Sequence, residues 1–299
     1  AFLFYIKIYF FDVRGVIILN INKTKKNLKN LADKIKKPFT HPYTKFVGKT
    51  SVAVSLADTL TNLGKSVLLI DGNFSAPNIG LHLNIIEPEN TIHHVLSGDS
   101  NISEAVYNIN NFDVIPGLVF SNKNFSPMKF RNKIKYLKNK YDIILVDSSP
   151  RLDEETLAVM MACDEILTVA TPDYSTLANT ISAVKLAKRR KTPIAGIVLN
   201  KVHNKKFEIP LKNIEKTTDV PVMAVIPHDI NILKAQAQFI PYTSHKPKSN
   251  ATREFHKLAS TISGTEYNSR KNLKDILRKL KPKPQDMNRT IYYQKIFQE

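Results

Sequence analysis

The sequence predicts a single α/β domain built on a doubly wound, predominantly parallel sheet flanked by helices. Two observations carry this prediction. From residue 49 onward, short and continuously apolar runs rich in β-branched residues alternate with segments of helical periodicity. Such runs are typical of strands buried on both faces, and strand–helix–strand alternation is typical of parallel sheets. At 299 residues, with 42% hydrophobic and 23% charged residues, the chain has an ordinary globular composition.

The first predicted element is a helix over residues 49–63. Val52, Leu56 and Leu60 share one of its faces, and Gly64 follows as a C-terminal stop. Strands are then predicted at residues 67–71, 112–116, 142–147, 165–171, 193–200 and 221–226. Helices are predicted between them, at residues 127–139, 153–162, 175–188 and 211–217. No repeat or long linker interrupts residues 49–265, which favours one domain.

The cysteine count and the distribution of charge along the chain limit the classes of function that the protein can have. Cys163 is the one cysteine, which excludes a disulfide scaffold and any cysteine-built zinc or iron–sulfur site within one chain. The net charge of +18 lies at the two ends. Residues 1–50 carry 11 Lys/Arg and 2 Asp/Glu, residues 268–299 carry 9 and 3, and the segment between them holds 24 and 21. Basic ends on a nearly neutral body indicate either solvated tails or contact with an anionic surface, phospholipid or nucleic acid.

The first 21 residues are apolar, but Lys7, Asp12 and Arg14 interrupt them. No run reaches the roughly 18 apolar residues of a membrane span, and no positive charge precedes the apolar stretch as in a secretory signal. The chain begins with Ala1 and has no methionine before Met128. We therefore interpret this opening segment as translated upstream sequence, which N-terminal sequencing of the native protein would test, and residues 1–38 as a basic extension whose authenticity is in question.

Ligands of a parallel α/β sheet bind beyond the carboxyl ends of its strands, so the polar residues there are candidate site residues. They are Asp71, Asp147, Thr171 to Asp173, Asn200 with Lys201, and Pro227 to Asp229. Upstream, Gly48, Lys49 and Thr50 open the first long helix. A Gly-Lys-Thr at a helix N-terminus can cradle phosphate, neutralise its charge with the lysine and ligate Mg²⁺ with the threonine. Asp147 adds a carboxylate that can hold the metal's water shell, the alternative being a helix cap.

Three blocks then carry a family resemblance: VLLIDGNFSAPNIGLHLNI, YDIILVDSSPRLDEETLAVMMACDEILTVATPDYSTL and PIAGIVLNKV. In this order and spacing they resemble the MinD/ParA class of P-loop ATPases, and most of all its archaeal MinD-like branch, over about residues 49–265. The resemblance implies a P-loop fold with an ATP–Mg²⁺ site and slow ATP hydrolysis. It also implies an ATP-dependent homodimer that works at a membrane or on DNA with a regulatory or cargo protein.

Carried over by position, the resemblance assigns the site residues. Lys49 is the catalytic phosphate-binding lysine, and Thr50, Asp71 and Asp147 hold the metal. Asp71 and Asn73, the other two catalytic residues, lie in the first switch segment. Asn200 reads the adenine edge, the alternative being a turn asparagine. The remaining ATP-binding residues are Lys45, Val47, Gly48, Ser51, Lys201, Pro227 and Asp229. The division into domains becomes 1–38 for the extension, 39–267 for the ATPase and 268–299 for a basic tail.

Two departures from the family pattern affect activity. The family's phosphate loop reads KGGxGKT, but Lys45 and Phe46 replace its early glycines, and the signature lysine falls on Thr44 unless Lys45 serves instead. Pro42 also makes the preceding segment a poor central strand. Either the chain is a weakly binding pseudo-ATPase, or the sequence near residues 40–46 contains an error, which we favour. Second, Asn73 stands where many relatives carry aspartate, and it can hold the attacking water but not take its proton.

The tail contains a predicted amphipathic helix over residues 268–281. Leu273, Ile276, Leu277 and Leu280 recur at helical spacing among basic residues, the pattern of a helix lying on an anionic bilayer. It also resembles the C-terminal targeting helix of MinD proteins; the alternative is a helix packed on the body. We expect a cytoplasmic protein, peripheral at the inner face of the cell membrane. DNA partitioning of the ParA type and a non-hydrolysing scaffold remain as alternatives.

Overall fold

The computed structural model describes residues 6–11, 47–119, 124–149, 153–265, 267, 285, 288, 289 and 291. Their strands form one sheet in the order β3-β4-β2-β5-β1-β6-β7-β8. The strands are β1 (Ile6–Phe11), β2 (Val67–Gly72), β3 (Tyr107–Ile109), β4 (Phe112–Ile115), β5 (Ile143–Ser148), β6 (Ile166–Ala170), β7 (Ile194–Val202) and β8 (Val222–Pro227). All neighbours pair in parallel except β3 with β4. The predicted fold class and its six strands are confirmed.

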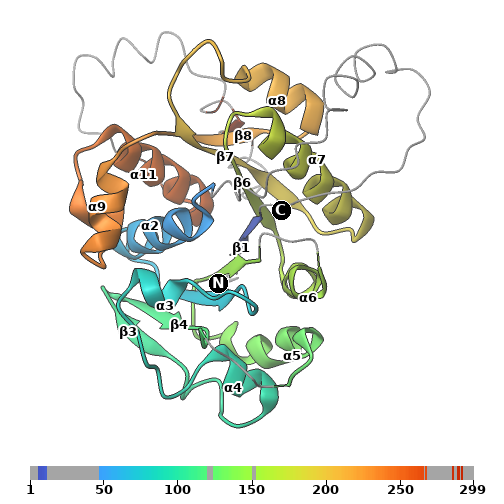
Figure 1. Ribbon diagram of the computed structural model, residues 1–299, viewed down its shortest axis with the longest axis vertical. Helices are drawn as coiled ribbons and strands as arrows, with labels where there is room; N and C mark the ends of the chain where they lie inside the picture. Colours follow the sequence, from blue (N-terminus) through green and yellow to red (C-terminus); the bar gives the residue numbers. More distant parts are fainter. Residues whose placement is uncertain are drawn as a thin grey trace.

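Helices cover both faces of this sheet (Figure 1). On one face, α2 (Lys49–Asn62) and α11 (Asn250–Ser263) pack on each other and on the strands, and α9 (Asn231–Ala237) and α10 (Tyr242–His245) lie beside them. On the other face lie α4 (Ile92–Ser97), α5 (Phe130–Ile134), α6 (Glu154–Ala162), α7 (Tyr174–Arg189) and α8 (Leu211–Thr218). Strands such as β2 and β5 are buried at every residue because apolar layers cover them from both sides.

The strand β1 changes the predicted domain division. Ile6–Phe11 pairs in parallel with β5 and β6 at the centre of the sheet, although the ATPase domain was expected to begin at residue 39. The sequence IKIYFF is rich in β-branched and aromatic residues, which suit a central strand. The segment just before the phosphate loop, predicted to be a poor central strand, lies outside the described residues.

The tail is anchored to the body at a point that the sequence did not indicate. Arg289 is 5% exposed, and its Nη2 donates to Glu254 Oε2 on α11 at 2.8 Å. Its Nε donates to the carbonyl oxygen of Met223 in β8, and Asn288 Nδ2 donates to Glu215 Oε1 on α8. The Arg289 side chain therefore binds a backbone carbonyl of β8, the last strand in the order of the described sheet.

The amphipathic segment 268–281 lies outside the described residues, so Leu273, Ile276, Leu277 and Leu280 stay predictions. It is joined to the body on both sides, by α11 before it and by the Arg289 contacts after it. Within the described parts of the chain, no helix has the length and apolarity needed to cross a bilayer.

Buried His93 fixes the segment that follows β2. Its ring is fully buried, Nε2 donates to the Phe74 carbonyl at 2.8 Å, and Nδ1 accepts from Leu118 N at 3.0 Å. These two bonds require the neutral ring. Burial lowers the pKa of His93 below its usual value, the Phe74 bond partly opposes this, and His94 adds to it.

We expect this histidine to make unfolding pH-dependent. Because the folded pKa is lowered, His93 stabilises the fold fully above the unfolded pKa of about 6.5, and this contribution falls as the pH drops below that value. His93→Gln can make both hydrogen bonds but does not titrate. Urea unfolding between pH 7.5 and 5 should therefore show a smaller loss of stability in the variant; equal losses in both proteins would contradict this.

Candidate functional site

The N-terminus of α2 lies at the carboxyl end of the sheet. Gly48 caps it with φ +83°, a left-handed conformation that glycine adopts without strain. A Cβ at Gly48 would lie 2.8 Å from Asn200 Nδ2, so the close approach of β7 also requires glycine. Asn200 is buried, and its Nδ2 donates to the Val47 carbonyl at 2.8 Å. The structure thus places Asn200 against the phosphate loop, while its predicted contact with adenine stays a prediction.

Thr50 and Asp147 meet directly, as the sequence predicted. Thr50 Oγ1 donates to Asp147 Oδ2 at 2.5 Å across 97 residues of sequence. Among the described residues, the other carboxylate oxygen, Oδ1, is buried without a hydrogen-bond partner. Burial raises the pKa of Asp147, and the charge of Lys49, the Thr50 bond and the charge of His82 oppose this rise. Lys49, Thr50 and Asp147 therefore share one site.

This site fits Mg²⁺. The ion prefers hard oxygen ligands and keeps several of its waters. The Thr50 hydroxyl and the unpartnered oxygen of Asp147 are such ligands, and the neighbouring Lys49 and the start of α2 supply positive charge for the phosphates that accompany the metal.

Asp71 holds the chain after β2. Strand register sets it beside Asp147, and it is fully buried. Its Oδ1 accepts from Asn73 N at 3.2 Å, and its Oδ2 accepts from Asn78 N and Ile79 N, both at 2.9 Å. Burial, reinforced by the charge of Asp147, raises the pKa of Asp71 to about 7 against these backbone bonds. Both oxygens thus bind the first turn of α3 (Ile79–His82) and its approach, and the predicted role of Asp71 in catalysis and as a magnesium ligand stays a prediction.

Asn73 is also engaged within this segment. Its Nδ2 donates to the Ala76 carbonyl at 2.5 Å, so its amide N–H shapes the turn. One residue pair links the turn to α6: Glu155 accepts from both the backbone N and the hydroxyl of Ser75. The predicted role of Asn73 in holding water stays a prediction.

The residues predicted near the base lie at the ends of β7 and β8. Lys201 follows Asn200 with φ +55°, close to Gly48. Pro227 ends β8, and Asp229 follows it in the loop before α9. Asp229 accepts from Asn231 and from Tyr242 Oη, at 2.6 Å, and these bonds lower its pKa although burial opposes them. Asp229 thus fixes its own loop.

The sequence did not identify two residues of the site, Gln236 and His82. Ser51, a predicted ATP-binding residue in the first turn of α2, is bound by Gln236 of α9, which in turn contacts His82 at the end of α3. No spacing pattern joins residues so far apart in sequence. Lys45 lies outside the described residues, so its contact with ATP stays a prediction.

Comparison with known proteins places this chain in a family. The family described as "AAA domain" matches residues 46–195, and the family described as "4Fe-4S iron sulfur cluster binding proteins, NifH/frxC family" matches residues 139–280. The cell division ATPase MinD of Pyrococcus furiosus is 34% identical, with a TM-score of 0.67 over 72% of this chain and 92% of that protein. The chain belongs to the MinD/ParA family of P-loop ATPases.

Further relatives agree with this placement in the MinD/ParA family. The septum site-determining protein MinD of Pyrococcus horikoshii, solved with Mg-ADP, is 28% identical, with a TM-score of 0.72 over 87% of this chain and 96% of that one. An uncharacterised ATP-binding protein of Methanocaldococcus jannaschii is 29% identical over 74% of this chain and 84% of its own length. Because Cys163 is the one cysteine, the NifH-type match reflects the shared P-loop fold and not a cluster built within one chain.

Proposed function

We propose that this MinD/ParA-family ATPase is a MinD-like switch that binds Mg-ATP, dimerises and positions cellular machinery at an anionic membrane surface. The observation that carries the nucleotide part is the contact of Thr50 with Asp147, whose second oxygen is buried and unpartnered beside Lys49. The similar MinD protein of P. horikoshii was solved with Mg-ADP, which supports the same ligand here.

In this mechanism each residue has a physical task. Lys49 and the N–H groups that open α2 bind the phosphates, and Thr50 and Asp147 hold Mg²⁺. The metal, when bound, neutralises charge that develops on the transferred phosphoryl group. Asn73 orients water by hydrogen bonding without taking its proton, so we expect slow hydrolysis. Positioning and charge stabilisation supply most of the catalysis in phosphoryl transfer, which is why an asparagine suffices.

The membrane part rests on the tail. We propose that Leu273, Ile276, Leu277 and Leu280 enter the interface of an anionic bilayer at the inner face of the cell membrane, while neighbouring lysines and arginines meet its charge. One such helix binds reversibly, and an ATP-dependent homodimer that presents two of them binds more tightly through avidity. Cytoplasmic protein would thus be recruited to the membrane in its ATP state, together with a regulatory or cargo protein.

ATPase rates with and without anionic liposomes or DNA test this proposal. Stimulation by liposomes is expected. Stimulation by DNA alone would instead indicate a ParA-type partitioning ATPase. Absence of turnover, with the protein still binding partners, would indicate a non-hydrolysing scaffold, which the replacement of the loop glycines by Lys45 and Phe46 favours.

Leu277→Glu tests the tail separately. It places a charge in the centre of the apolar stripe, so we expect it to abolish sedimentation with anionic vesicles in the presence of Mg-ATP. DNA binding through the lysines would gain nothing from the stripe and would be nearly unaffected. Equal pelleting of the variant and the parent chain on anionic vesicles would contradict membrane attachment through this helix.

A further inference from the structure

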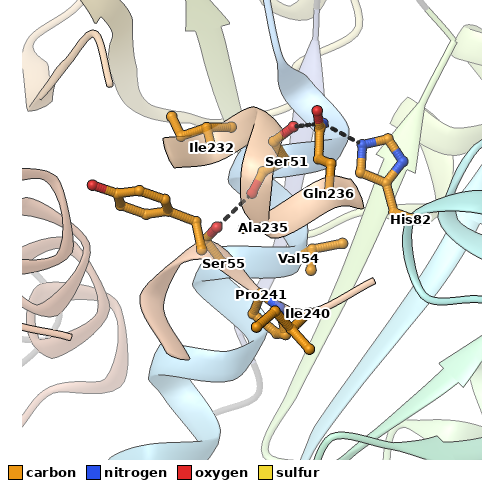
Figure 2. A pocket seen from close by; sticks show the side chains of 10 residues that line it. Ser51, Val54, Ser55, His82, Ile232, Ala235, Gln236, Ile240 and Pro241 are labelled. Atoms are coloured by element: carbon orange, nitrogen blue, oxygen red, sulfur yellow. Dashed lines mark hydrogen bonds between the residues drawn. The ribbon is translucent and has the colours of Figure 1, made fainter. Parts of the chain in front are cut away.

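Three elements that meet beside the phosphate site are joined by one side chain. Gln236 extends from α9 between α2 and α3, and its Nε2 lies 2.7 Å from Ser51 Oγ and 2.9 Å from His82 Nε2 (Figure 2). The other ring nitrogen, His82 Nδ1, lies 2.9 Å from the Asn78 carbonyl oxygen. Asn78 is itself held by Asp71, so the chain of contacts runs from β2 to the first turn of α2.

The direction of each hydrogen bond follows from donor and acceptor chemistry. A carbonyl oxygen only accepts, so His82 Nδ1 carries the proton and, in the neutral ring, Nε2 accepts. The group of Gln236 that faces His82 must then be its NH₂, whose second hydrogen points to Ser51. Ser51 Oγ is therefore an acceptor from Gln236. Among the described residues, nothing accepts the hydroxyl proton of Ser51 in turn.

We infer that Gln236 is a positioning residue of the nucleotide site, which holds the Ser51 hydroxyl as a hydrogen-bond donor toward a nucleotide phosphate oxygen. Ser51 directly follows Thr50 in the first turn of α2, where the helix N-terminus attracts anions. Fixing the hydroxyl before the nucleotide arrives removes the need to order it during binding. This inference rests on the proposed function as an Mg-ATP binding protein.

Gln236→Glu separates positioning from packing. The carboxylate keeps the length of the side chain and accepts from Ser51, so the contact between α9 and α2 persists. The Ser51 hydroxyl, however, turns to donate to the Glu carboxylate. It is then no longer available as a hydrogen-bond donor to the nucleotide phosphate. We expect at least a tenfold weaker affinity for Mg-ATP with an unchanged melting temperature. Gln236→Leu, which neither donates nor accepts, should weaken binding about threefold.

The Ser51→Ala background identifies the cause. If Gln236 acts through Ser51, Gln236→Glu should change Mg-ATP affinity less than twofold in that background. Gln238→Glu, on the exposed end of α9, adds the same charge away from Ser51 and should bind as the parent does.

Titration calorimetry with Mg-ATP reads out every variant and distinguishes the two proposals. If the parent chain binds and Gln236→Glu binds equally well, the positioning role is overturned and the proposed function stands. An equal loss with and without Ser51 would show simple charge repulsion and would also overturn the positioning role. If the parent chain itself fails to bind Mg-ATP, the proposed function falls, and the role of Gln236 falls with it.

Discussion

Lys49→Ala is expected to weaken Mg-ATP binding at least 100-fold and to abolish hydrolysis. Lys49 lies in the first turn of α2 beside Asp147, where it is placed to meet the terminal phosphates. Charge-assisted hydrogen bonds of this kind contribute about 1.5–3 kcal/mol each, and a loss of about 3 kcal/mol corresponds to roughly 100-fold in affinity. Calorimetric titration of parent and variant with Mg-ATP measures the loss.

Lys185→Ala is the matched control, because Lys185 is exposed on the outer side of α7. It removes the same charge from the protein without touching the site and should leave affinity unchanged. Binding by Lys49→Ala within about threefold of the parent would show that Lys49 does not bind the phosphates. If the sequence around residues 40–46 is authentic, we expect even the parent to bind ATP poorly, because Lys45 and Phe46 replace the glycines of the loop.

Arg289→Met is expected to lower the free energy of unfolding by about 3 kcal/mol, the lower end of the range for removing one partner of a buried ion pair. The loss leaves Glu254, which is mostly buried, without its guanidinium partner, and it frees the Met223 carbonyl at the edge of the sheet. Lys257 Nζ lies 3.1 Å from Glu254 Oε1 and still compensates part of the negative charge of Glu254. A larger loss in the free energy of unfolding is therefore not expected. Urea unfolding followed by far-ultraviolet circular dichroism measures the change.

Arg253→Met provides the comparison one residue from Glu254. Arg253 is exposed and, within the part of the chain that the structure describes, donates to Asn250 on its own helix, so its removal should cost less than about 0.5 kcal/mol. Combining Arg289→Met with Glu254→Met removes both charges and should recover much of the stability lost by Arg289→Met alone. A cost for Arg289→Met no greater than that for Arg253→Met would show that the tail does not anchor to β8.

The local pattern of apolar residues was enough to predict most strands of the sheet. Runs such as that of β2 are apolar at every position because both faces of the strand are covered, so their composition alone distinguishes them from surface strands. Two strands were not predicted. The strand β3 (Tyr107–Ile109) has three residues, too few to show an alternating pattern. The pairing partners of β1, β5 and β6, lie more than 130 residues away, and no local signal specifies such long-range pairing. Five helices were also missed: α3, α4, α9, α10 and α11. The first four have seven residues or fewer, which carry too little periodicity to be recognised. The helix α11 has 14 residues, so its length does not explain why it was missed.

The candidate site also has features that the sequence predicted and features that only the tertiary structure decided. The sequence by itself determined the fold class, the family, and the meeting of Thr50 with Asp147, because residue type and position at strand ends fix these. Only the tertiary structure decided that Asp71 binds backbone N–H groups, that Asn200 lies on the phosphate loop, that Gln236 joins Ser51 to His82, and that Arg289 pairs with Glu254. Each of these depends on a hydrogen bond whose partner is chosen by packing of the surrounding elements. A polar side chain in the sequence states what it can bind, but burial and geometry determine which partner it meets.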